Sequence, residues 1–453
     1  MSSSHSSRKF SVDFARGAGV VRPVNGVNLG PLSRHGTYDF SEYHRKLRIP
    51  LTRLHDCPYA VAETVDIHHI FPDFRADADD PSNYRFARTD AYIQSILDVG
   101  SQIVYRLGET IDHFRVKPFI DPPAEADKWA TICVNIIRHY NDGWANGFHH
   151  GIRFWEIWNE PMNPPCWSGT WEQFLDLYET AATRIKAHDP SLQVGGAALA
   201  GDEPYWELRH DFVRQCARRG CPLDFLSWHI YTDQPAEILR RVRHVRELLD
   251  ESGLAATASH LNEWNYLAEN SWAVQLSGDP RIRRHSFQDM LGGAPGAAFT
   301  ASVLMLLQDA PIDEANYYWA REGGWGLFDD YGAPRKNYYA MLAFAKLLEL
   351  GGRVASEGSD AEYGLAICAA ADDEQTSAAV LLSNQLCEQR EYELRLANLP
   401  WAGETTCVIS IVDEDRDLQP LPDGKLSGEA PTVTISLPPA SVALVQIERA
   451  GGA

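Results

Sequence analysis

Short runs of apolar and β-branched residues recur between residues 24 and 350, and longer stretches with helical spacing of their apolar positions separate them. This alternation is typical of βαβ units, which build a parallel sheet. Eight runs predict eight strands, enough to close a (β/α)8 barrel. The predicted strands cover residues 24–30, 49–55, 101–107, 152–160, 192–198, 224–231, 257–263 and 314–319.

The connection between the fourth and fifth predicted strands has clear helix signals. Thr170 and Gln173 have the spacing of a capping box, in which two side chains satisfy backbone N–H groups at a helix start. The apolar positions that follow predict a helix over 171–188. This helix ends at Asp189-Pro190, because the residue before a proline avoids the helical conformation.

The pattern changes near residue 353, where short runs with period-two alternation replace the helical stretches. Such runs predict strands with one buried and one solvated face. Residues 9–14 alternate in the same way and are expected to join them. The predicted fold class is α/β, a (β/α)8 TIM barrel over 15–352 with an accessory antiparallel β-sandwich over 353–453, joined by residues 8–14. The strands predicted for this second domain cover 378–382, 391–396, 407–412, 432–437 and 442–447.

Charge and composition narrow the class of partner. The chain of 453 residues has a formal net charge of −21, which repels phosphate backbones and anionic lipids, so neither nucleic acid nor membrane is expected as a partner. The N-terminal residues lack the apolar core of a secretory signal, and no apolar stretch approaches the roughly 18 residues of a membrane span. We therefore expect a soluble, cytoplasmic protein. Secretion after removal of a leader peptide and assembly into a homo-oligomer both stay open. The eight cysteines show no Cys-x-x-Cys spacing, so no disulfide framework, metal or other cofactor is predicted.

Two glutamates stand at the ends of predicted strands four and seven. Glu160 closes one apolar run at an Asn-Glu-Pro corner, and Glu263 closes another. Catalytic side chains of barrels lie at these strand ends, and glycosidic bond cleavage needs a carboxyl group that holds a proton beside one that stays ionised. The pair therefore predicts glycosidase chemistry. Glu156, deeper on the same strand as Glu160, is expected to be a structural carboxylate paired with Arg53 or Arg153.

The segment Trp158-Asn159-Glu160-Pro161 resembles the acid/base motif of the retaining (β/α)8 glycosidases of clan A. Within that clan the chain is most similar to glycoside hydrolase family 39, the group of β-xylosidase and α-L-iduronidase-like enzymes, and further similarity lies in residues 53–56, 224–231 and 325–329. The resemblance implies a retaining O-glycosyl hydrolase with Glu160 as acid/base and Glu263 as nucleophile. It favours an exo-acting, β-xylosidase-like enzyme on plant or microbial oligosaccharides.

The resemblance also implies a sugar-binding set around the two carboxylates. Asn159 is similar to the asparagine that binds the hydroxyl next to the reacting carbon, and Trp319 to an aromatic floor. Polar residues at strand ends are similar to those that line the sugar subsite, and neighbouring tryptophans are candidate stacking platforms. The remaining candidates for substrate binding are His55, Asp56, Trp167, His229, Tyr231 and Trp264.

Several alternatives remain at this point. His55, His229 and Tyr231 could be hydrogen-bonded core residues, Asp56 could cap a loop, and the tryptophans, Trp325 included, could be core. The segment around Glu263 departs from the Thr-Glu-Phe/Tyr pattern that is frequent in family β-xylosidases, which leaves the sugar open. An endo-glycosidase acting on a bacterial exopolysaccharide, a non-catalytic carbohydrate-binding barrel and a metal-dependent barrel hydrolase are the rival functions. Glu109, after the third predicted strand, is a further candidate subsite carboxylate.

Overall fold

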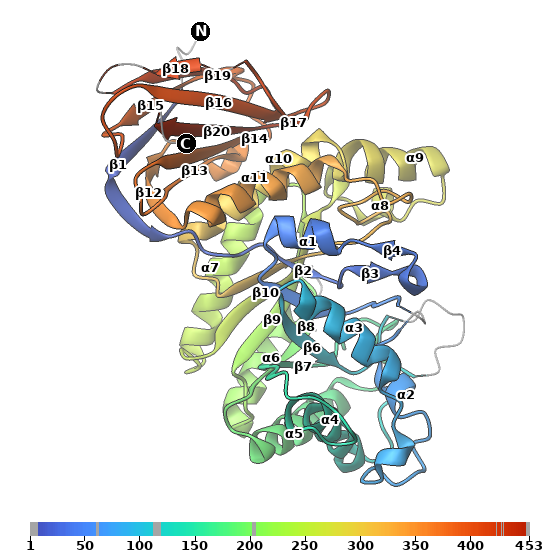
Figure 1. Cartoon of the computed structure of the whole chain (residues 1–453). Helices are drawn as coiled ribbons and strands as arrows, with labels where there is room; N and C mark the ends of the chain where they lie inside the picture. The colour runs from blue at the N-terminus through green and yellow to red at the C-terminus, as the bar shows by residue number, and fades with distance from the viewer. Residues whose placement is uncertain are drawn as a thin grey trace.

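The computed structural model describes residues 8–449 except 60–62, 112–118, 202–204, 423, 427 and 429. Eight parallel strands form a closed barrel, and a second, ten-stranded sheet lies above it in Figure 1. This arrangement confirms the predicted fold class. The barrel strands are β2 (Gly26–Asn28), β5 (Leu51–Leu54), β6 (Gln102–Leu107), β7 (Phe154–Ile157), β8 (Gln193–Leu199), β9 (Phe225–Thr232), β10 (Ala258–Tyr266) and β11 (Glu314–Tyr317).

One helix follows each barrel strand and covers the outside of the barrel. The capping box predicted from Thr170 and Gln173 is present at the start of α5, with both of its hydrogen bonds formed. Apolar faces of these helices, together with the outward side chains of the strands, make the main core. The helices are α1 (Ser41–Leu47), α3 (Ala87–Asp98), α4 (Ala126–Asp142), α5 (Trp171–His188), α6 (Trp206–Arg219), α7 (Pro235–Glu251), α10 (Ala294–Leu306) and α11 (Lys336–Leu350).

Two of the loops at the carboxyl ends of the barrel strands contain short helices. The loop after β5 contains α2 (Ile67–Ile70), and the loop after β10 contains α8 (Trp272–Gln275) and α9 (Pro280–Arg284). In the described part of the chain, no single helix is both long and apolar enough to span a membrane. Only the segments 280–291 and 294–309, bent by 44° relative to each other, reach that length and composition as a pair.

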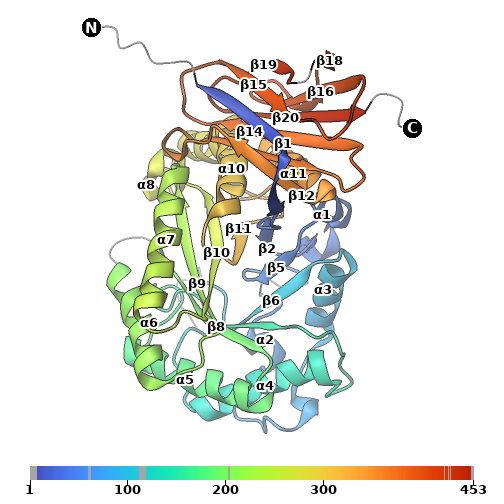
Figure 2. The same cartoon turned by 90° about the vertical axis from the view of Figure 1, so that its left-hand side faces the viewer.

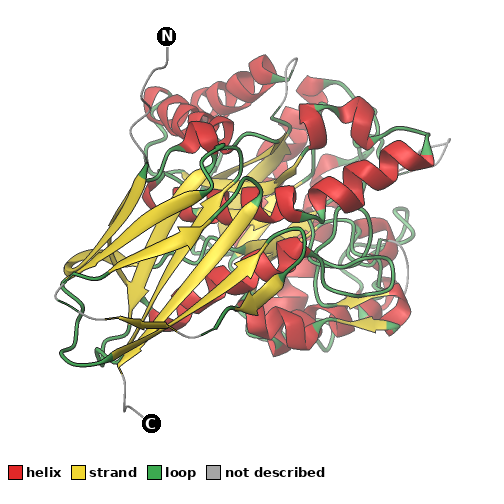
Figure 3. Ribbon diagram, turned by 90° about the horizontal axis from the view of Figure 1, so that it is seen from above, coloured by secondary structure: helices red, strands yellow, loops and turns green. Residues whose placement is uncertain are grey.

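The second sheet includes the N-terminal strand β1 (Lys9–Val20), which pairs antiparallel with β12 and parallel with β15. Figure 2 shows β1 lying among strands from the other end of the chain, and Figure 3 shows the molecule from above, with its long strands gathered on the left. The boundary between the two modules remains a prediction, and its last residues, 450–453, lie outside the described residues. The other strands of this sheet are β12 (Gly352–Glu357), β13 (Leu365–Ala371), β14 (Ser377–Asn384), β15 (Glu391–Ala397), β16 (Thr405–Val412), β17 (Asp417–Pro420), β18 (Gly424–Leu426), β19 (Thr432–Ser436) and β20 (Ser441–Arg449).

The centre of the second sheet is buried on both faces. Ala366, Cys368 and Ala370 of β13 belong to the barrel core, whereas the alternate residues of the same strand belong to a second core inside the curled sheet. Ser302 of α10 donates a hydrogen bond to the carbonyl of Gly364, 2.6 Å away, just before β13. The sheet therefore packs directly on α10 and α11. All eight cysteines are buried free thiols.

Irregular backbone at the strand ends aims side chains into the mouth of the barrel. Between β9 and β10, Leu261 pairs with Trp228 but Glu263 pairs with His229, so Asn262 is the extra residue of a β-bulge. Three residues at the carboxyl ends of β5 and β7 have positive φ: Asp56 at 53°, Trp158 at 68° and Glu160 at 44°. Such conformations cost about 1–3 kcal/mol each and cluster at functional sites.

The contact between β8 and β9 gives a first testable prediction. A Cβ added at Gly195 would lie 2.1 Å from the carbonyl oxygen of Phe225 and 2.5 Å from its ring. Because two backbones meet there, Gly195→Ala is expected to lower the free energy of unfolding by about 3 kcal/mol, the upper range of overpacking costs. Gly278→Ala, with nothing within 4 Å of its Cβ, is the matched control, and chemical denaturation of both variants is the measurement. Equal free energies of unfolding for the two variants would contradict the close contact between Gly195 and Phe225.

Candidate active site

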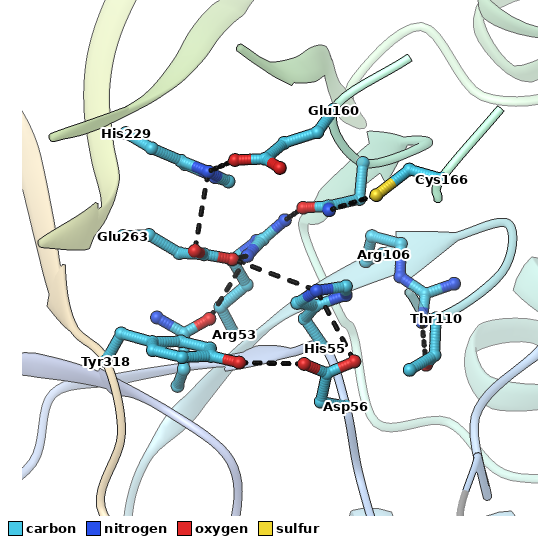
Figure 4. A network of polar contacts seen from close by, with 12 residues as sticks. Arg53, His55, Asp56, Arg106, Thr110, Glu160, Cys166, His229, Glu263 and Tyr318 are labelled. Atoms are coloured by element: carbon cyan, nitrogen blue, oxygen red, sulfur yellow. Dashed lines mark hydrogen bonds and ion pairs between the residues drawn. The ribbon is translucent and has the colours of Figure 1, made fainter. Parts of the chain in front are cut away.

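Glu160 and Glu263 meet at the mouth of the barrel. Glu160 follows β7, Glu263 lies on β10, and His229 lies on the intervening β9 (Figure 4). One carboxylate oxygen of each glutamate and one ring nitrogen of His229 lie within 4.8 Å of one another. The structure thus brings together the two carboxyl groups that the sequence singled out.

Glu263 is held by two strong donors. Arg53 Nη1 donates to Glu263 Oε1 at 2.7 Å, and the Tyr231 hydroxyl donates to Oε2 at 2.7 Å. Burial raises the pKa of Glu263, whereas His229, Arg53 and the Tyr231 hydrogen bond act in the opposite direction. The guanidinium and the hydroxyl fix the orientation of the carboxylate and favour its ionised form.

Glu160 has weaker hydrogen-bond partners. Asn163 Nδ2 donates to Glu160 Oε2 at 3.1 Å, and His229 Nδ1 lies 2.8 Å from Oε1. Burial raises the pKa of Glu160, and the Asn163 hydrogen bond and Arg53 oppose that change only in part. Burial also lowers the pKa of His229 to about 4, so its ring is neutral near pH 7. Glu160 is therefore the carboxyl group better suited to carry a proton.

Arg53 connects Glu263 to Glu156 and Asn159. This fully buried guanidinium donates through Nε to Glu156 Oε2 at 2.6 Å and through Nη2 to Asn159 Oδ1 at 2.8 Å, besides its bond to Glu263. Burial opposes the charge, but Glu156 and Glu263 raise the pKa of Arg53 above its ordinary value. Arg53 is thus one of the two partners predicted for Glu156. Its contact with Glu263 was not predicted, although its position two residues before His55 on an inward-facing strand was a usable signal.

Asn159, His55 and Asp56 also lie beside the pair. Asn159 Oδ1 is bound to Arg53, and among the described residues its Nδ2 makes only a long contact of 3.9 Å to Cys166 Sγ. His55 Nε2 lies 3.9 Å from Glu263 Oε1 and 3.5 Å from Asp56 Oδ1. Burial raises the pKa of Asp56 to about 6 despite a hydrogen bond from Tyr318. Two further polar groups, an amide donor and an imidazole, therefore lie beside the carboxylates.

Aromatic rings line the side of the site next to Tyr231. The Tyr231 ring makes edge contacts with Trp272 at 5.2 Å, Trp325 at 5.4 Å and Tyr318 at 6.1 Å between centroids. These four rings are partly exposed, and we call them the aromatic wall. No sequence pattern marks Trp272, which comes from the long loop after β10, or Tyr318, whose neighbour Trp319 is the aromatic residue that the family resemblance points to.

The remaining predicted tryptophans are placed differently. Trp264 is fully buried between Tyr317 and Phe299, on the side of β10 away from Glu263. Trp167 is buried against Trp158, and its Nε1 donates to the Thr170 carbonyl. Neither ring is brought to the carboxylates, which assigns both to the core.

Trp319 lies at the edge of the aromatic wall. Its ring is partly exposed, stands next to Tyr318 with 4.9 Å between centroids, and lies 4.3 Å beneath the Arg321 guanidinium. Its Nε1 donates to the Glu322 carbonyl at 3.1 Å. The ring is therefore held by the loop after β11 and stays a candidate platform beside the wall.

Three groups of side chains among the described residues have a spacing that could hold a metal ion. One is the Glu160, His229 and Glu263 set, whose oxygens already accept hydrogen bonds from protein donors. The other two share one histidine in the loop after β5. Those groups are Glu63, His68 and His69, and Asp66, His68 and Glu109.

Comparison with known proteins places this barrel among glycoside hydrolases. The model of Glycosyl hydrolases family 39 matches residues 24–387, a stretch that contains both Glu160 and Glu263. The chain is 28% identical over 227 residues to a β-xylosidase of Geobacillus stearothermophilus, which covers 43% of this chain and 44% of that protein. It is 27% identical over 314 residues to a β-xylosidase of Caldicellulosiruptor saccharolyticus, covering 60% and 59% respectively. The matches span less than two thirds of either relative.

Solved structures resemble the whole chain. A glucosidase from Croceicoccus marinus superposes with a TM-score of 0.82 at 25% identity, covering 98% of this chain and 99% of that one. A monomeric β-xylosidase from Caulobacter crescentus CB15 gives a TM-score of 0.73 at 18% identity, covering 98% and 100%. The shared architecture therefore includes both the barrel and the second sheet.

Proposed function

Because the chain belongs to glycosyl hydrolase family 39, we propose that it hydrolyses glycosidic bonds with retention of anomeric configuration. The preferred activity is that of an exo-acting, β-xylosidase-like enzyme on oligosaccharides. The β-xylosidase relatives support this choice, and the similarity to a glucosidase makes glucosides the first alternative substrate.

The separation of the two carboxyl groups carries this proposal. Their nearest ligand oxygens lie within 4.8 Å. Retaining glycosidases hold the two carboxyl groups about 5–5.5 Å apart. Inverting enzymes need roughly 6.5–9.5 Å, because a water molecule must fit between the base carboxylate and the sugar. The narrow gap supports direct attack of one carboxylate on the sugar.

The electrostatics support distinct roles for the two groups. Glu263, oriented by Arg53 and Tyr231, attacks the anomeric carbon while Glu160 gives its proton to the departing oxygen. The glycosidic C–O bond breaks as the ester bond to Glu263 forms. Glu160, now ionised, then takes a proton from water, whose oxygen attacks the same carbon and releases Glu263. Two inversions at one carbon give net retention.

Donors around the pair support recognition of sugar hydroxyls. Asn159 Nδ2 makes only its long sulfur contact, and the buried His229 Nε2 has no protein partner among the described residues. An amide donor that binds the 2-hydroxyl more tightly in the transition state than in the ground state would raise the rate. The aromatic wall supplies apolar ring faces for the sugar.

Exo action is supported by the loop after β10. This loop carries α8 and α9, and it brings Trp272 against Tyr231. A wall on one side of the carboxylates favours a site that accepts a terminal sugar.

A panel of aryl glycosides tests the proposed activity. Xylosides, arabinosides, galactosides, glucosides and uronides in both anomeric forms are supplied, and the first-formed sugar anomer is followed by NMR. We expect turnover of a β-xyloside or a closely related β-glycoside, with the β-anomer appearing first. Appearance of the α-anomer first would contradict retention, and a silent panel would favour endo action or binding alone.

Replacement of Glu160 by glutamine separates the acid role from others. We expect kcat on glycosides with poor leaving groups to fall by about 10²–10⁴-fold, the usual contribution of general acid catalysis. Dinitrophenyl glycosides, whose leaving groups need no proton, should lose far less in the glycosylation step. The alkaline limb of kcat/KM reports loss of the Glu160 proton, and burial places this limb above the ordinary value of 4.5.

The pH profile supplies the control for this prediction. In Glu160→Gln the alkaline limb should disappear. In Asn163→Ala it should move to higher pH, because the Asn163 hydrogen bond lowers the pKa of Glu160. Equal losses on activated and unactivated substrates would count against Glu160 as the acid.

A further inference from the structure

A second cluster of ligand-type side chains lies in the loop between β5 and α3. Glu63, His68 and His69 each have one ligand atom within 4.8 Å of the others. His69 Nε2 lies 3.3 Å from Glu63 Oε2, and the two imidazole rings are 4.1 Å apart. Two imidazoles and one carboxylate make a donor set that suits zinc-class divalent ions.

The cluster is open to solvent on one side. Its side chains are 27%, 13% and 31% exposed for Glu63, His68 and His69. An ion could therefore enter from water, and a water molecule could occupy a fourth position. The ring of Phe119 stacks on His68 with 3.8 Å between centroids and an interplanar angle of 4°, which fixes the plane of this imidazole.

Glu109 binds the His68 side chain of the cluster from the barrel side. This buried carboxylate, at the end of β6, contacts His68 Nδ1 through Oε2 and accepts the His68 backbone N–H at Oε1, 3.3 Å away. Histidines that bind metals usually donate their other ring N–H to a carboxylate, which fixes the tautomer and raises the basicity of the ligand nitrogen. With Nδ1 bound to Glu109, His68 offers Nε2 to an ion.

The overlapping set that contains Asp66 is a weaker candidate. Asp66 Oδ1 accepts hydrogen bonds from Arg106 Nη2 at 2.5 Å and Thr110 Oγ1 at 2.8 Å, and Oδ2 accepts the Thr110 backbone N–H at 2.6 Å. Its oxygens are already bound, and a guanidinium beside them repels a cation. An ion is therefore expected on the other side of His68.

We propose that Glu63, His68 and His69 bind one divalent metal ion of the zinc class, with Glu109 as the carboxylate partner of His68. The ion links residues 63–69 of the loop after β5 to the end of β6 at the mouth of the barrel. This site does not depend on the proposed glycosidase activity. Glu63 and the adjacent His68-His69 pair are a usable signal in the sequence, but their spacing differs from His-x3–5-His.

Zinc titration of the whole chain tests the site. Protein treated with a chelator and dialysed is titrated with ZnCl2 in a calorimeter, and bound zinc is measured by elemental analysis. We expect one zinc ion per chain and a higher melting temperature with zinc. Glu63→Gln and His69→Gln should weaken binding at least 100-fold, and Glu109→Gln by about 10–100-fold, the usual effect of losing a carboxylate partner.

Two histidine variants are matched controls. His244→Gln alters a pair whose Nε2 atoms, on His210 and His244, lie 2.9 Å apart, and His229→Gln alters the set beside Glu160. Both variants should still bind one zinc ion. Wild type loaded with Co²⁺ in place of zinc should show visible absorption that His69→Gln lacks. Circular dichroism melting verifies that each variant is folded. Absence of stoichiometric zinc in the wild type, or its loss in a control but not in His69→Gln, would overturn the proposal.

Discussion

Glu263→Ala is expected to abolish turnover of aryl xylosides, with a loss in kcat on the order of 10⁴-fold or more, as when other nucleophiles are removed. The reason is covalent: without this carboxylate no glycosyl-enzyme ester can form. Sugar binding should persist, because Asn159 and His229 remain in place. Steady-state kinetics and calorimetric binding of xylose are the measurements.

Added azide distinguishes a lost nucleophile from a damaged site. The anion fits the space left by the side chain and attacks the sugar from the same face, so an α-glycosyl azide should form at a restored rate. Glu314→Gln is the control, because this largely buried carboxyl group starts β11, at the opposite end of the barrel. Normal activity of Glu263→Ala would refute the nucleophilic role. So would a result in which the Glu314→Gln control is as inactive as Glu263→Ala.

Arg53→Met is expected to combine the largest stability loss with a shifted pH profile. Glu156 and Glu263 would be left buried without their cation, and breaking a buried pair in this way costs about 3–5 kcal/mol. An opposite charge close to a carboxylate lowers its pKa by roughly 1–3 units. Loss of Arg53 should therefore keep Glu263 protonated to higher pH and move the acid limb of kcat/KM upward by about that amount.

Two further variants separate stability from catalysis. Arg53→Met combined with Glu156→Gln removes one uncompensated charge, so it should recover stability but not the original pH profile. Arg153→Met alters the other arginine that the sequence offered as a partner of Glu156, and this exposed side chain lies over the Phe154 ring. It should leave both properties unchanged. An unshifted acid limb in Arg53→Met would exclude an electrostatic effect of Arg53 on Glu263.

The barrel could be predicted because each strand lies between recognisable helices. Its strands are buried on both faces and are read as continuous apolar runs. In the second sheet, β15 alternates strictly and was found, with exposed Glu391, Glu393 and Arg395 between buried neighbours. β13 is buried on both faces like β14, but it consists largely of alanine, which is depleted in strands, so its sequence does not predict a strand.

The same distinction explains the candidate site. Two carboxylates at strand ends could be predicted, because a parallel barrel brings those ends together. The bulge at Asn262 could not, although it lets both Asn262 and Glu263 reach the interior, where they contact Glu156 and Arg53. Trp264 was selected as a neighbour of Glu263 in sequence, but successive residues of a strand point to opposite sides.

The position of β1 has a consequence for biosynthesis. Asp13 pairs with Ala355 and with Ala397, so β1 has no partner strand until β12 and β15, far later along the chain, have been synthesised. Its alternating Phe10, Val12 and Phe14 stay exposed meanwhile as an unpaired edge. Contacts this distant along the chain form slowly, which makes cool, slow expression the natural choice for recombinant production.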